Sequence, residues 1–584
     1  MKHTASYIPE YPRPQFVRKA WVDLNGAWDF AFDKDGTGLE KGYSGGFDTK
    51  QKINVPFAYQ VKASGIGDTE LCEHIWYSRK LALDPKKDVR ILLHLEGCDY
   101  VTHVWLNGKD CGSATGGYHR LTFDLTGAAV KGENTLVIGV EDSYSKEQPR
   151  GKQRWQSTDH GCWYIDTSGI YKSVWLEEVN ACHIESARIT PEPSSRSATV
   201  EFVADVPSGT PAVIEVKAAY GGKTVASGSA ALVNGRGTVK LVIAENDMHL
   251  WGVGAPELYD LDFALKANGF VTDRVASYFG MREIKTEGGR VLLNGKPLYQ
   301  KLVLDQGYWQ DSGLTPPSEA ALEHDIELMT EMGFNGCRKH EKIEDERFMY
   351  YADIYGYVMW CEMPSEYCLT EKSKRALAEE WRLVTEQMYN HPCIICWVCF
   401  NESWGIEDIK TNEATQKFVN DVYYAVKAFD GTRLVVTNDG WEHTVSDLLT
   451  VHHYTQSGQT LHDCFDTLEK CCKEVYAEHD RGAFADGYKY NGQPVMITEF
   501  GGTAFVKDAV GAKWGYGNGV GNTEEYVARF ASLIEAIDTI PFVCGYCYTQ
   551  LSDVYHEVNG LCEFDRTPKA DTKTIARILA EKGR

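Results

Sequence analysis

From about residue 290 onward, short apolar segments alternate with helix-like segments eight times along the chain. One helix is predicted from Ser318, which can cap its first turn, to Met332, because Ala321, Ile326 and Met329 fall near one face. Eight successive β–α units predict a TIM barrel. The predicted strands are residues 298–305, 334–340, 357–364, 394–402, 434–439, 448–454, 495–500 and 542–550.

The part of the chain before residue 285 predicts β-structure only. Alternating segments at 90–95, 101–106, 134–140 and 172–176 are separated by turn residues, and Asn107-Gly108 is a hairpin signal. The composition changes near residue 180, and segments 199–203, 212–216 and 237–242 predict a second β unit. The sequence therefore predicts a multidomain β and α/β protein, with a jelly-roll β-sandwich over 1–180, an immunoglobulin-like β-sandwich over 181–284 and the TIM barrel over 285–584.

Two of the predicted barrel strands end on a glutamate in a similar setting. Glu402 lies in the segment 401–405, NESWG, and Glu499 lies 97 positions later in the segment 497–502, ITEFGG. Hydrolysis of a glycosidic bond needs one carboxylic acid that protonates the leaving oxygen and one carboxylate that attacks or stabilises the sugar carbon. The strand ends of a barrel meet at one face, so other polar residues there are candidates for the same site. These are Asp305, His340, Glu362, Asp439, Tyr454 and Gln550.

The composition excludes several classes of partner. A net charge of −23 argues against a nucleic-acid or anionic-membrane partner, because phosphate binding needs clustered Lys and Arg. The start of the chain has no apolar segment of the signal-peptide kind, and the longest apolar run, residues 393–400, is too short to span a membrane. We therefore expect a cytoplasmic protein with a neutral, hydroxyl-rich substrate.

The cysteines support a reducing compartment. Their number, 17, is odd, and several lie inside predicted core strands. Cys393, Cys396 and Cys399 have the spacing of an iron–sulfur run, but no fourth Cys followed by Pro comes after them. Residues three apart on a strand face opposite sides, so we expect buried thiols and no cluster.

Several segments of the chain, in order, resemble glycoside hydrolase family 2, which includes β-galactosidases, β-glucuronidases and β-mannosidases. The similarity covers nearly the whole chain and implies the domain order given above. The segments are 10–15 (EYPRPQ), 24–30 (LNGAWDF), 167–171 (TSGIY), 391–392 (HP) running into 401–402 (NE), and 498–501 (TEFG).

The resemblance implies roles for residues of the barrel. Glu402 would be the acid/base and Glu499 the nucleophile, and Asn401 would bind the sugar 2-hydroxyl. Arg338 and Tyr454 match positions that hydrogen-bond the nucleophile in the family. His340 falls near a sugar-binding position, although residues 338–340, RKH, are one residue shorter than the common R-x-S-H pattern.

The residues at and beyond the strand ends bear on which sugar the chain would bind. Many relatives have a tryptophan on the eighth strand, where this chain has Thr549-Gln550. Family glucuronidases carry an N-x-K motif after that strand, but residues 557–562, EVNGLC, contain no lysine, which disfavours a glucuronide. Sugar rings stack on aromatic side chains, and the loop 151–166 reaches toward the barrel in relatives. Four tryptophans just beyond strand ends are candidates for sugar contact, Trp309, Trp404, Trp441 and Trp514, whereas Trp360 and Trp397 inside strands are expected in the core.

The predicted function is that of a retaining, exo-acting β-glycosidase, most simply a β-galactosidase-like glycoside hydrolase that needs no cofactor. An alternative is another specificity of the family, such as a β-mannosidase, an arabinosidase or a uronidase that uses Lys152 or Arg154 as its clamp. A further alternative is a non-catalytic carbohydrate-binding protein, which would not need the paired glutamates. A carbohydrate or glycoside is the expected partner, no metal-ligand cluster stands out, and the sequence is compatible with a homo-oligomer.

Overall fold

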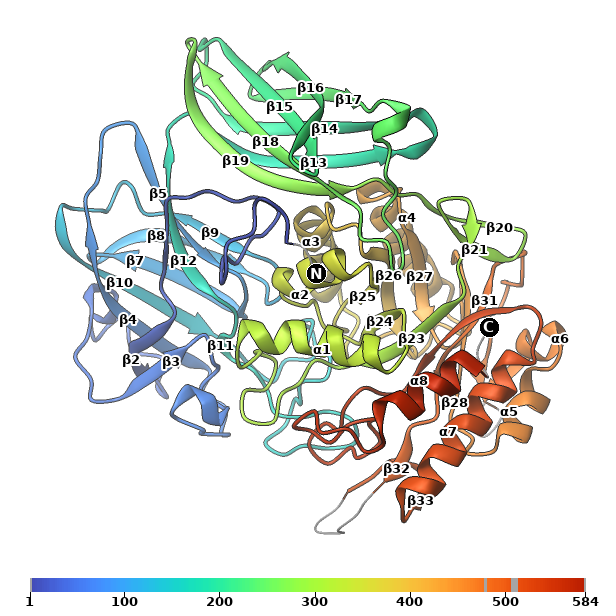
Figure 1. The fold of residues 1–584 in the computed structure, drawn as a ribbon. Helices are drawn as coiled ribbons and strands as arrows, with labels where there is room; N and C mark the ends of the chain where they lie inside the picture. Colours follow the sequence, from blue (N-terminus) through green and yellow to red (C-terminus); the bar gives the residue numbers. More distant parts are fainter. Residues whose placement is uncertain (1–2, 477–480, 506–512, 582–584) are drawn as a thin grey trace.

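The computed structural model describes residues 3–476, 481–505 and 513–581. Figure 1 shows two β-sandwiches beside a barrel: the blue first sandwich, the green second sandwich and the yellow-to-red barrel. This is the predicted fold class, and we keep 1–180, 181–284 and 285–584 as the proposed domain limits. None of the described helices is both long enough and apolar enough to cross a membrane.

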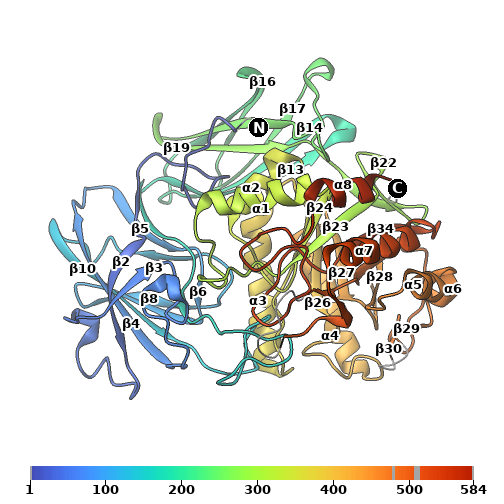
Figure 2. The same cartoon turned by 60° about the horizontal axis from the view of Figure 1, so that its bottom comes forward.

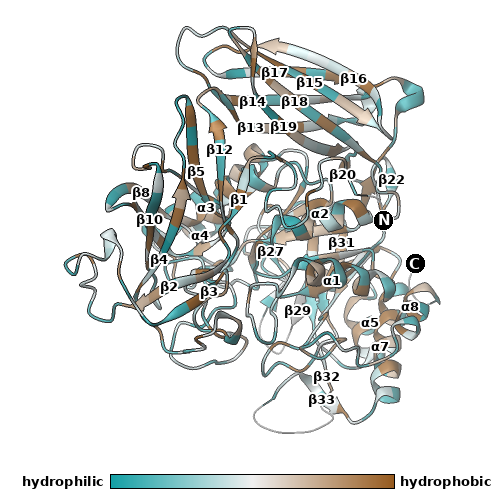
Figure 3. Cartoon of the chain, turned by 60° about the vertical axis from the view of Figure 1, so that its left-hand side comes forward, coloured by the Kyte–Doolittle hydropathy of each residue, from teal (hydrophilic) through white to brown (hydrophobic). Residues whose placement is uncertain are grey.

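The first sandwich packs a six-stranded sheet on a four-stranded sheet. Inward side chains such as Trp28, Phe30, Tyr77 and Leu93 form its core, and Figure 3 shows the alternation as brown and teal bands along strands such as β5. The six-stranded sheet has the order β3 (Lys52–Val55), β2 (Gly26–Phe32), β4 (His74–Leu83), β10 (Gly132–Glu141), β7 (Val101–Leu106), β8 (Lys109–Thr115). The four-stranded sheet has the order β1 (Trp21–Asp23), β12 (Val174–Asn180), β5 (Val89–Leu95), β9 (Leu121–Asp124).

The predicted hairpin at Asn107-Gly108 is confirmed. These two residues connect the antiparallel strands β7 and β8, with φ of +56° and +74°. Positive φ at both central residues is typical of the type I′ turn, which asparagine and glycine adopt at low cost.

The second sandwich packs a three-stranded sheet on a four-stranded sheet. Phe202 of one sheet meets Phe263 of the other edge to face, with ring centroids 5.0 Å apart. The sheets have the orders β13 (His183–Glu192), β14 (Ser197–Asp205), β17 (Arg236–Val242) and β16 (Lys223–Ala231), β15 (Ala212–Tyr220), β18 (Leu258–Ala267), β19 (Phe270–Gly280).

The barrel has eight parallel strands, each within a few residues of its prediction. Ser318 caps the first helix by accepting from Ala321 N, as expected. The strand order is β27 (Leu434–Asp439), β26 (Ile394–Asn401), β25 (Val358–Glu362), β24 (Gly336–Lys339), β23 (Gln300–Asp305), β34 (Val543–Tyr548), β31 (Val495–Phe500), β28 (Leu449–His453). The helices are α1 (Glu319–Glu331), α2 (Glu346–Tyr355), α3 (Glu371–Met388), α4 (Glu413–Phe429), α5 (Gly458–Phe465), α6 (Leu468–Cys471), α7 (Thr523–Asp538) and α8 (Thr572–Glu581).

Short strands complete the chain. They are β6 (Cys98–Asp99), β11 (Gly169–Ile170), β20 (Ile284–Glu287), β21 (Arg290–Leu293), β22 (Lys296–Pro297), β29 (Glu474–Tyr476), β30 (Arg481–Gly482), β32 (Thr503–Phe505) and β33 (Tyr516–Val520).

The cysteines and the two strand tryptophans lie as predicted. All 17 cysteines are free thiols, and Cys393, Cys396 and Cys399 are buried along β26. Trp360 and Trp397 are fully buried in the barrel core. Each donates its indole N–H at 2.8–2.9 Å, to Gln300 and to Asp430 respectively, so both have structural partners.

Candidate active site

Two glutamates lie close together at the carboxyl end of the barrel strands. Glu402 follows β26 directly and Glu499 lies near the end of β31. A carboxylate oxygen of Glu402 lies within 4.8 Å of one of Glu499. Glu402 has φ of +50°, a left-handed conformation that is unusual outside glycine and that concentrates at functional sites. The two residues that the sequence singled out are therefore brought together.

Arg338 of β24 connects the carboxylates at the bottom of the site. Its guanidinium is fully buried and lies 2.7 Å from Glu499, 2.6 Å from Glu362 and 2.9 Å from Asp439. It also donates at 2.7 Å to the side-chain oxygen of Asn401, which orients that amide. One cation thus orients both Glu499 and Asn401.

Glu499 lies in a strongly positive environment. Burial raises the pKa of this carboxyl group, but His452, Arg338 and His340 outweigh burial and hold the pKa at about 2. Tyr454, just after β28, donates its hydroxyl to Glu499. The arrangement keeps Glu499 ionised, as a nucleophile requires.

His340 lies in the same cluster. Its Nδ1 is 2.9 Å from Glu362 and 3.9 Å from Glu499. Arg338 and His340 are two residues apart and therefore share one face of their strand. The shorter spacing relative to the family pattern does not keep His340 away from the nucleophile.

Two neighbours of the glutamates were missed by the sequence reading. His452, in β28, bridges Glu402 at 2.8 Å and Glu499 at 3.6 Å. Tyr516, in β33, stacks flat on Tyr454 with ring centroids 3.5 Å apart. His452 precedes Tyr454 by two residues, so the alternation of the strand is a signal that could have identified it.

A cavity of about 280 Å³ opens beside Glu402. Trp404 and Trp441 contribute aromatic walls, as the sequence suggested. The cavity is lined by Glu402, Trp404, Trp441, His452, Tyr454, Arg481 and Tyr516.

Trp514 and Trp309 lie outside this lining. Trp514 donates its indole N–H to Gly161 O at 3.2 Å and packs edge-on against Tyr516, so it joins the barrel to the first sandwich beside the site. Trp309 lies under the guanidinium of Arg566, 4.0 Å from ring centroid to carbon, where it serves packing.

Gln550 belongs to a buried polar group beyond β34. It accepts from Gln306 at 3.0 Å and donates to Asn559 at 2.7 Å. Asn559 in turn donates to Glu557 at 3.0 Å, and Tyr164 of the first sandwich donates to the same carboxyl group. The stretch that lacks the lysine of the glucuronate motif therefore carries a buried carboxyl group.

Asp305 is not in this cluster, contrary to its place among the candidates. Its carboxylate pairs with Lys339 and accepts from Gly307 N at 2.7 Å. The strand register pairs Asp305 with Lys339, whereas the neighbouring Arg338 is the residue that reaches Glu499. Because side chains alternate along strands, Asp305 shares the face of Lys339 and not that of Arg338.

A loop of the first sandwich packs against one wall of the site. In Figures 1 and 2 this segment, in teal, runs from the blue domain to the barrel. Its Trp163 packs edge-on against Trp404 at 4.9 Å. Arg154 is paired with Asp166 at 2.8 Å and Asp159 at 3.0 Å. Lys152 is buried, with its ammonium 3.4 Å from the Cys162 sulfur and 4.0 Å from Glu341.

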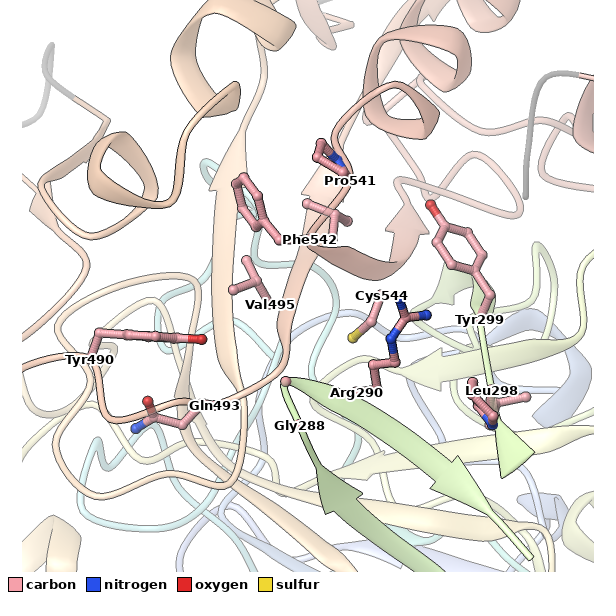
Figure 4. Close-up of a pocket in the computed structure, with 13 residues that line it drawn as sticks. Gly288, Arg290, Leu298, Tyr299, Tyr490, Gln493, Val495, Pro541, Phe542 and Cys544 are labelled. Carbon is pink, nitrogen blue, oxygen red and sulfur yellow. The ribbon is translucent and has the colours of Figure 1, made fainter. Parts of the chain in front are cut away.

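A larger cavity, of about 440 Å³, lies at the opposite end of the barrel, where β31 and β34 begin. Figure 4 shows Tyr490, Phe542 and Arg290 around it. Among the described residues that line it there is no carboxylate, and catalysis in barrels belongs to the other end. The 280 Å³ cavity is therefore the candidate active site.

Comparison with known proteins agrees with this geometry. The model of the "Glycosyl hydrolases family 2, TIM barrel domain" matches residues 284–581, just over half of the chain. Models of the "Glycosyl hydrolase 2 galactose-binding domain-like" and "Glycosyl hydrolases family 2" domains match residues 65–171 and 182–282.

Individual relatives are distant. A β-galactosidase of Thermoanaerobacter pseudethanolicus is 25% identical over 70% of this chain and 53% of its own length. The chain spans less than half of two further relatives. A β-glucuronidase of Paenibacillus borealis is 23% identical over 98% of both chains. The β-glucuronidase of Ruminococcus gnavus in complex with D-glucuronic acid shares the fold, with a TM-score of 0.78 at 18% identity over 99% of this chain and 100% of that chain. From the match of the barrel model, this chain belongs to glycosyl hydrolases family 2.

Proposed function

We propose that this chain is a retaining, exo-acting β-glycosidase that releases a terminal non-reducing sugar through a glycosyl-enzyme intermediate. The separation of the two carboxylates carries the proposal, because oxygens of Glu402 and Glu499 lie within 4.8 Å of each other. Retaining glycosidases hold their carboxyl groups about 5–5.5 Å apart, whereas inverting ones need about 6.5–9.5 Å to admit a water.

The surroundings of each glutamate support a division of roles. Glu499, held anionic by Arg338 and Tyr454, attacks the anomeric carbon while Glu402 delivers a proton to the leaving oxygen. In the second step Glu402 removes a proton from water, the water oxygen bonds to the anomeric carbon, and Glu499 leaves as a carboxylate. Asn401, oriented by Arg338, is suited to bind the sugar 2-hydroxyl.

Replacement of Glu402 by alanine tests these roles. Activated p-nitrophenyl glycosides need little protonation, so the first step survives in Glu402→Ala, and added azide replaces water in the second step. The expected product is a β-glycosyl azide of retained configuration, identified by NMR. An α-glycosyl azide, formed by direct displacement, would instead make Glu402 the nucleophile.

A neutral sugar is the substrate class that we favour, as in a β-galactosidase. Glu557 is buried where the glucuronate motif would have its polar residues, and Gln306, Asn559 and Tyr164 all donate to it. A carboxylate in this place accepts hydrogen bonds from sugar hydroxyls and repels a second carboxylate. Burial of an uncompensated charge costs several kcal/mol.

The measurement is kcat/KM for p-nitrophenyl β-galactoside and p-nitrophenyl β-glucuronide in one buffer. We expect the neutral glycoside to be preferred by roughly 100-fold or more, which corresponds to about 2.7 kcal/mol. A preference for the glucuronide would overturn the neutral-sugar proposal and leave the two glutamates in their roles.

A uronidase is the second candidate, and Lys152 is the observation that favours it. Burial lowers the pKa of this ammonium, but nearby acidic groups, Cys162 and Glu341 foremost, outweigh burial and hold the pKa above its ordinary value. Lys152 therefore stays charged, whereas Arg154 is committed to Asp166 and Asp159. If Lys152 clamps a uronate, Lys152→Met lowers kcat/KM for the glucuronide selectively; an equal loss on both glycosides assigns it to the structure of the loop.

A further inference from the structure

His452 has contacts that the two-glutamate mechanism does not use. One ring nitrogen, Nδ1, lies 2.8 Å from Glu402 and 3.6 Å from Glu499, and the other, Nε2, lies 3.3 Å from Asp439. The ring is almost completely buried and lines the 280 Å³ cavity. An imidazole with a carboxylate close to each nitrogen is favoured in its doubly protonated, cationic form.

The backbone holds the ring of His452 in one place. Gly440, with φ of +108°, passes so close that a Cβ there would lie 2.6 Å from His452 Nδ1. Trp441 packs edge-on against the imidazole, with ring centroids 5.6 Å apart. The contact with Glu402 is therefore fixed by packing on one side and by Asp439 on the other.

We propose that His452, held by Asp439, carries the proton that Glu402 delivers to the leaving group, so that the acid of this site is an Asp439–His452–Glu402 relay. The inference rests on the proposed glycosidase function and adds a positioning, proton-holding residue to it. Glu402 directly follows β26, Asp439 ends β27, which pairs with β26, and His452 lies in β28 at the other end of the strand order; Figure 2 shows the three strands in the same part of the barrel.

The charges around His452 favour a doubly protonated ring. Glu402, Glu499 and Asp439 face the ring, Arg338 lies behind Asp439 and Glu499, and Arg481 lines the same cavity. Burial lowers the pKa of His452, but Glu499, Asp439 and Glu402 outweigh burial and raise the pKa to about 10. The nearby His443 is neutral at working pH, because burial lowers its pKa to about 4.

The proton balance closes over one turnover. In the first step the proton moves from His452 Nδ1 through Glu402 to the leaving oxygen, the glycosidic C–O bond breaks, and a Glu499 oxygen bonds to the anomeric carbon. In the second step Glu402 takes a proton from the attacking water, the ester bond to Glu499 breaks, and the proton returns to His452 Nδ1. No oxidant, reductant or metal is needed.

The test is the pH profile of kcat/KM for His452→Asn, which keeps a polar side chain but cannot hold the second proton. In the wild type the alkaline limb reports loss of the proton held by His452 and is expected near pH 10. The variant lacks the proton-holding imidazole, so we expect the limb to move to lower pH by at least about one unit.

Leaving-group dependence provides the second readout. For a phenyl glycoside, which needs protonation, kcat/KM of the variant should fall by roughly 100-fold or more; for a 2,4-dinitrophenyl glycoside the loss should stay below roughly 10-fold. An unmoved alkaline limb, or an equal loss on both substrates, would overturn the relay and assign His452 to structure. Azide rescue of Glu402→Ala is independent of this result, so it separates failure of the relay from failure of the proposed function.

His443→Asn is the matched control. It also removes a buried imidazole, but His443 bonds to Thr450 O at 2.8 Å and has no contact with Glu402 among the described residues. We expect the position of its alkaline limb to equal that of the wild type. A limb displaced as far as that of His452→Asn would show that loss of any buried imidazole moves it, which would contradict the relay.

Discussion

At the scale of single residues, the electrostatics of the site depend on the buried guanidinium of Arg338. It lies among Glu362, Asp439 and Glu499, and the last of these has its pKa lowered to about 2 although burial raises it. A carboxyl group with this pKa is fully ionised near neutral pH. Replacement of Glu499 by a neutral isostere should therefore abolish turnover and leave the neighbouring side chains in place.

Glu499→Gln is the corresponding prediction. The amide keeps the shape of the side chain but cannot form the glycosyl ester, so we expect kcat to fall roughly 10⁴-fold or more. The assay is steady-state hydrolysis of a p-nitrophenyl glycoside, with circular dichroism to show that the fold is retained. Residual activity above a few per cent of wild type would remove Glu499 from the nucleophile role.

The sequence predicted some of these residues and missed others for one physical reason. Glu402 and Glu499 stand out because each ends an apolar strand, and the structure places them together. Which way a strand residue faces follows from alternation along the strand. Counted from Arg338, alternation sends Lys339, and with it Asp305, away from the nucleophile; counted from Tyr454, it brings His452 inward. Tyr516 lies in β33, a short strand that is not among those predicted from the sequence.

At the scale of elements, the eight barrel strands were predictable because each is a short apolar run, whereas the loops that shape the cavity have no such signal. The loop that follows β25 hydrogen-bonds to the first sandwich, since Ser365 O accepts from Arg150 N and Gly151 N at 2.9 and 3.1 Å. The next residue, Glu366, has a buried carboxyl group, and neither oxygen has a hydrogen-bond partner in the described structure. Burial raises the pKa of Glu366 to about 8.

The pH dependence of stability follows from Glu366. Its folded pKa of about 8 exceeds its ordinary value of 4.5, so unfolding releases a proton between these values and stability falls as pH rises through this range. Urea unfolding of wild type and Glu366→Gln at pH 5.5 and 8 should show that only the wild type loses this contribution, by up to about 1.4 kcal/mol per pH unit. Glu371→Gln, at an exposed helix start, is the control; equal pH dependence in all three proteins would contradict the assignment.

At the scale of the whole molecule, Arg18 joins the two sandwiches. Its guanidinium lies 3.0 Å from Glu177 in β12 and 2.7 Å from Asp273 in β19, and all three side chains are buried. This network sits between domains whose strands are otherwise separate sheets. Loss of the cation leaves Glu177 with only His94, at 3.0 Å, and Asp273 with only the backbone N–H of Ile184, at 2.8 Å, among the partners described, and neither carries the fixed charge of Arg18.

Arg18→Ala should therefore lower the free energy of unfolding by about 3–5 kcal/mol, the usual cost of breaking a buried ion pair. The measurement is the urea midpoint, followed by tryptophan fluorescence. Lys86→Ala removes an exposed pair with Glu178 and should leave the urea midpoint close to that of the wild type. If the two variants unfold at the same midpoint, Arg18 does not hold the sandwiches together.

The loop of the first sandwich packs Trp163 on Trp404. Residues that can influence the choice of sugar and residues proposed to cleave the bond therefore lie in distant parts of the sequence. The proposed acid and nucleophile are held by strands of the barrel, while Trp163, which packs against the cavity-lining Trp404, belongs to a segment far upstream. Substitutions in this segment can therefore alter substrate specificity without changing the catalytic strands. A library for altered specificity should accordingly begin in residues 151–166, outside the domain that performs the chemistry.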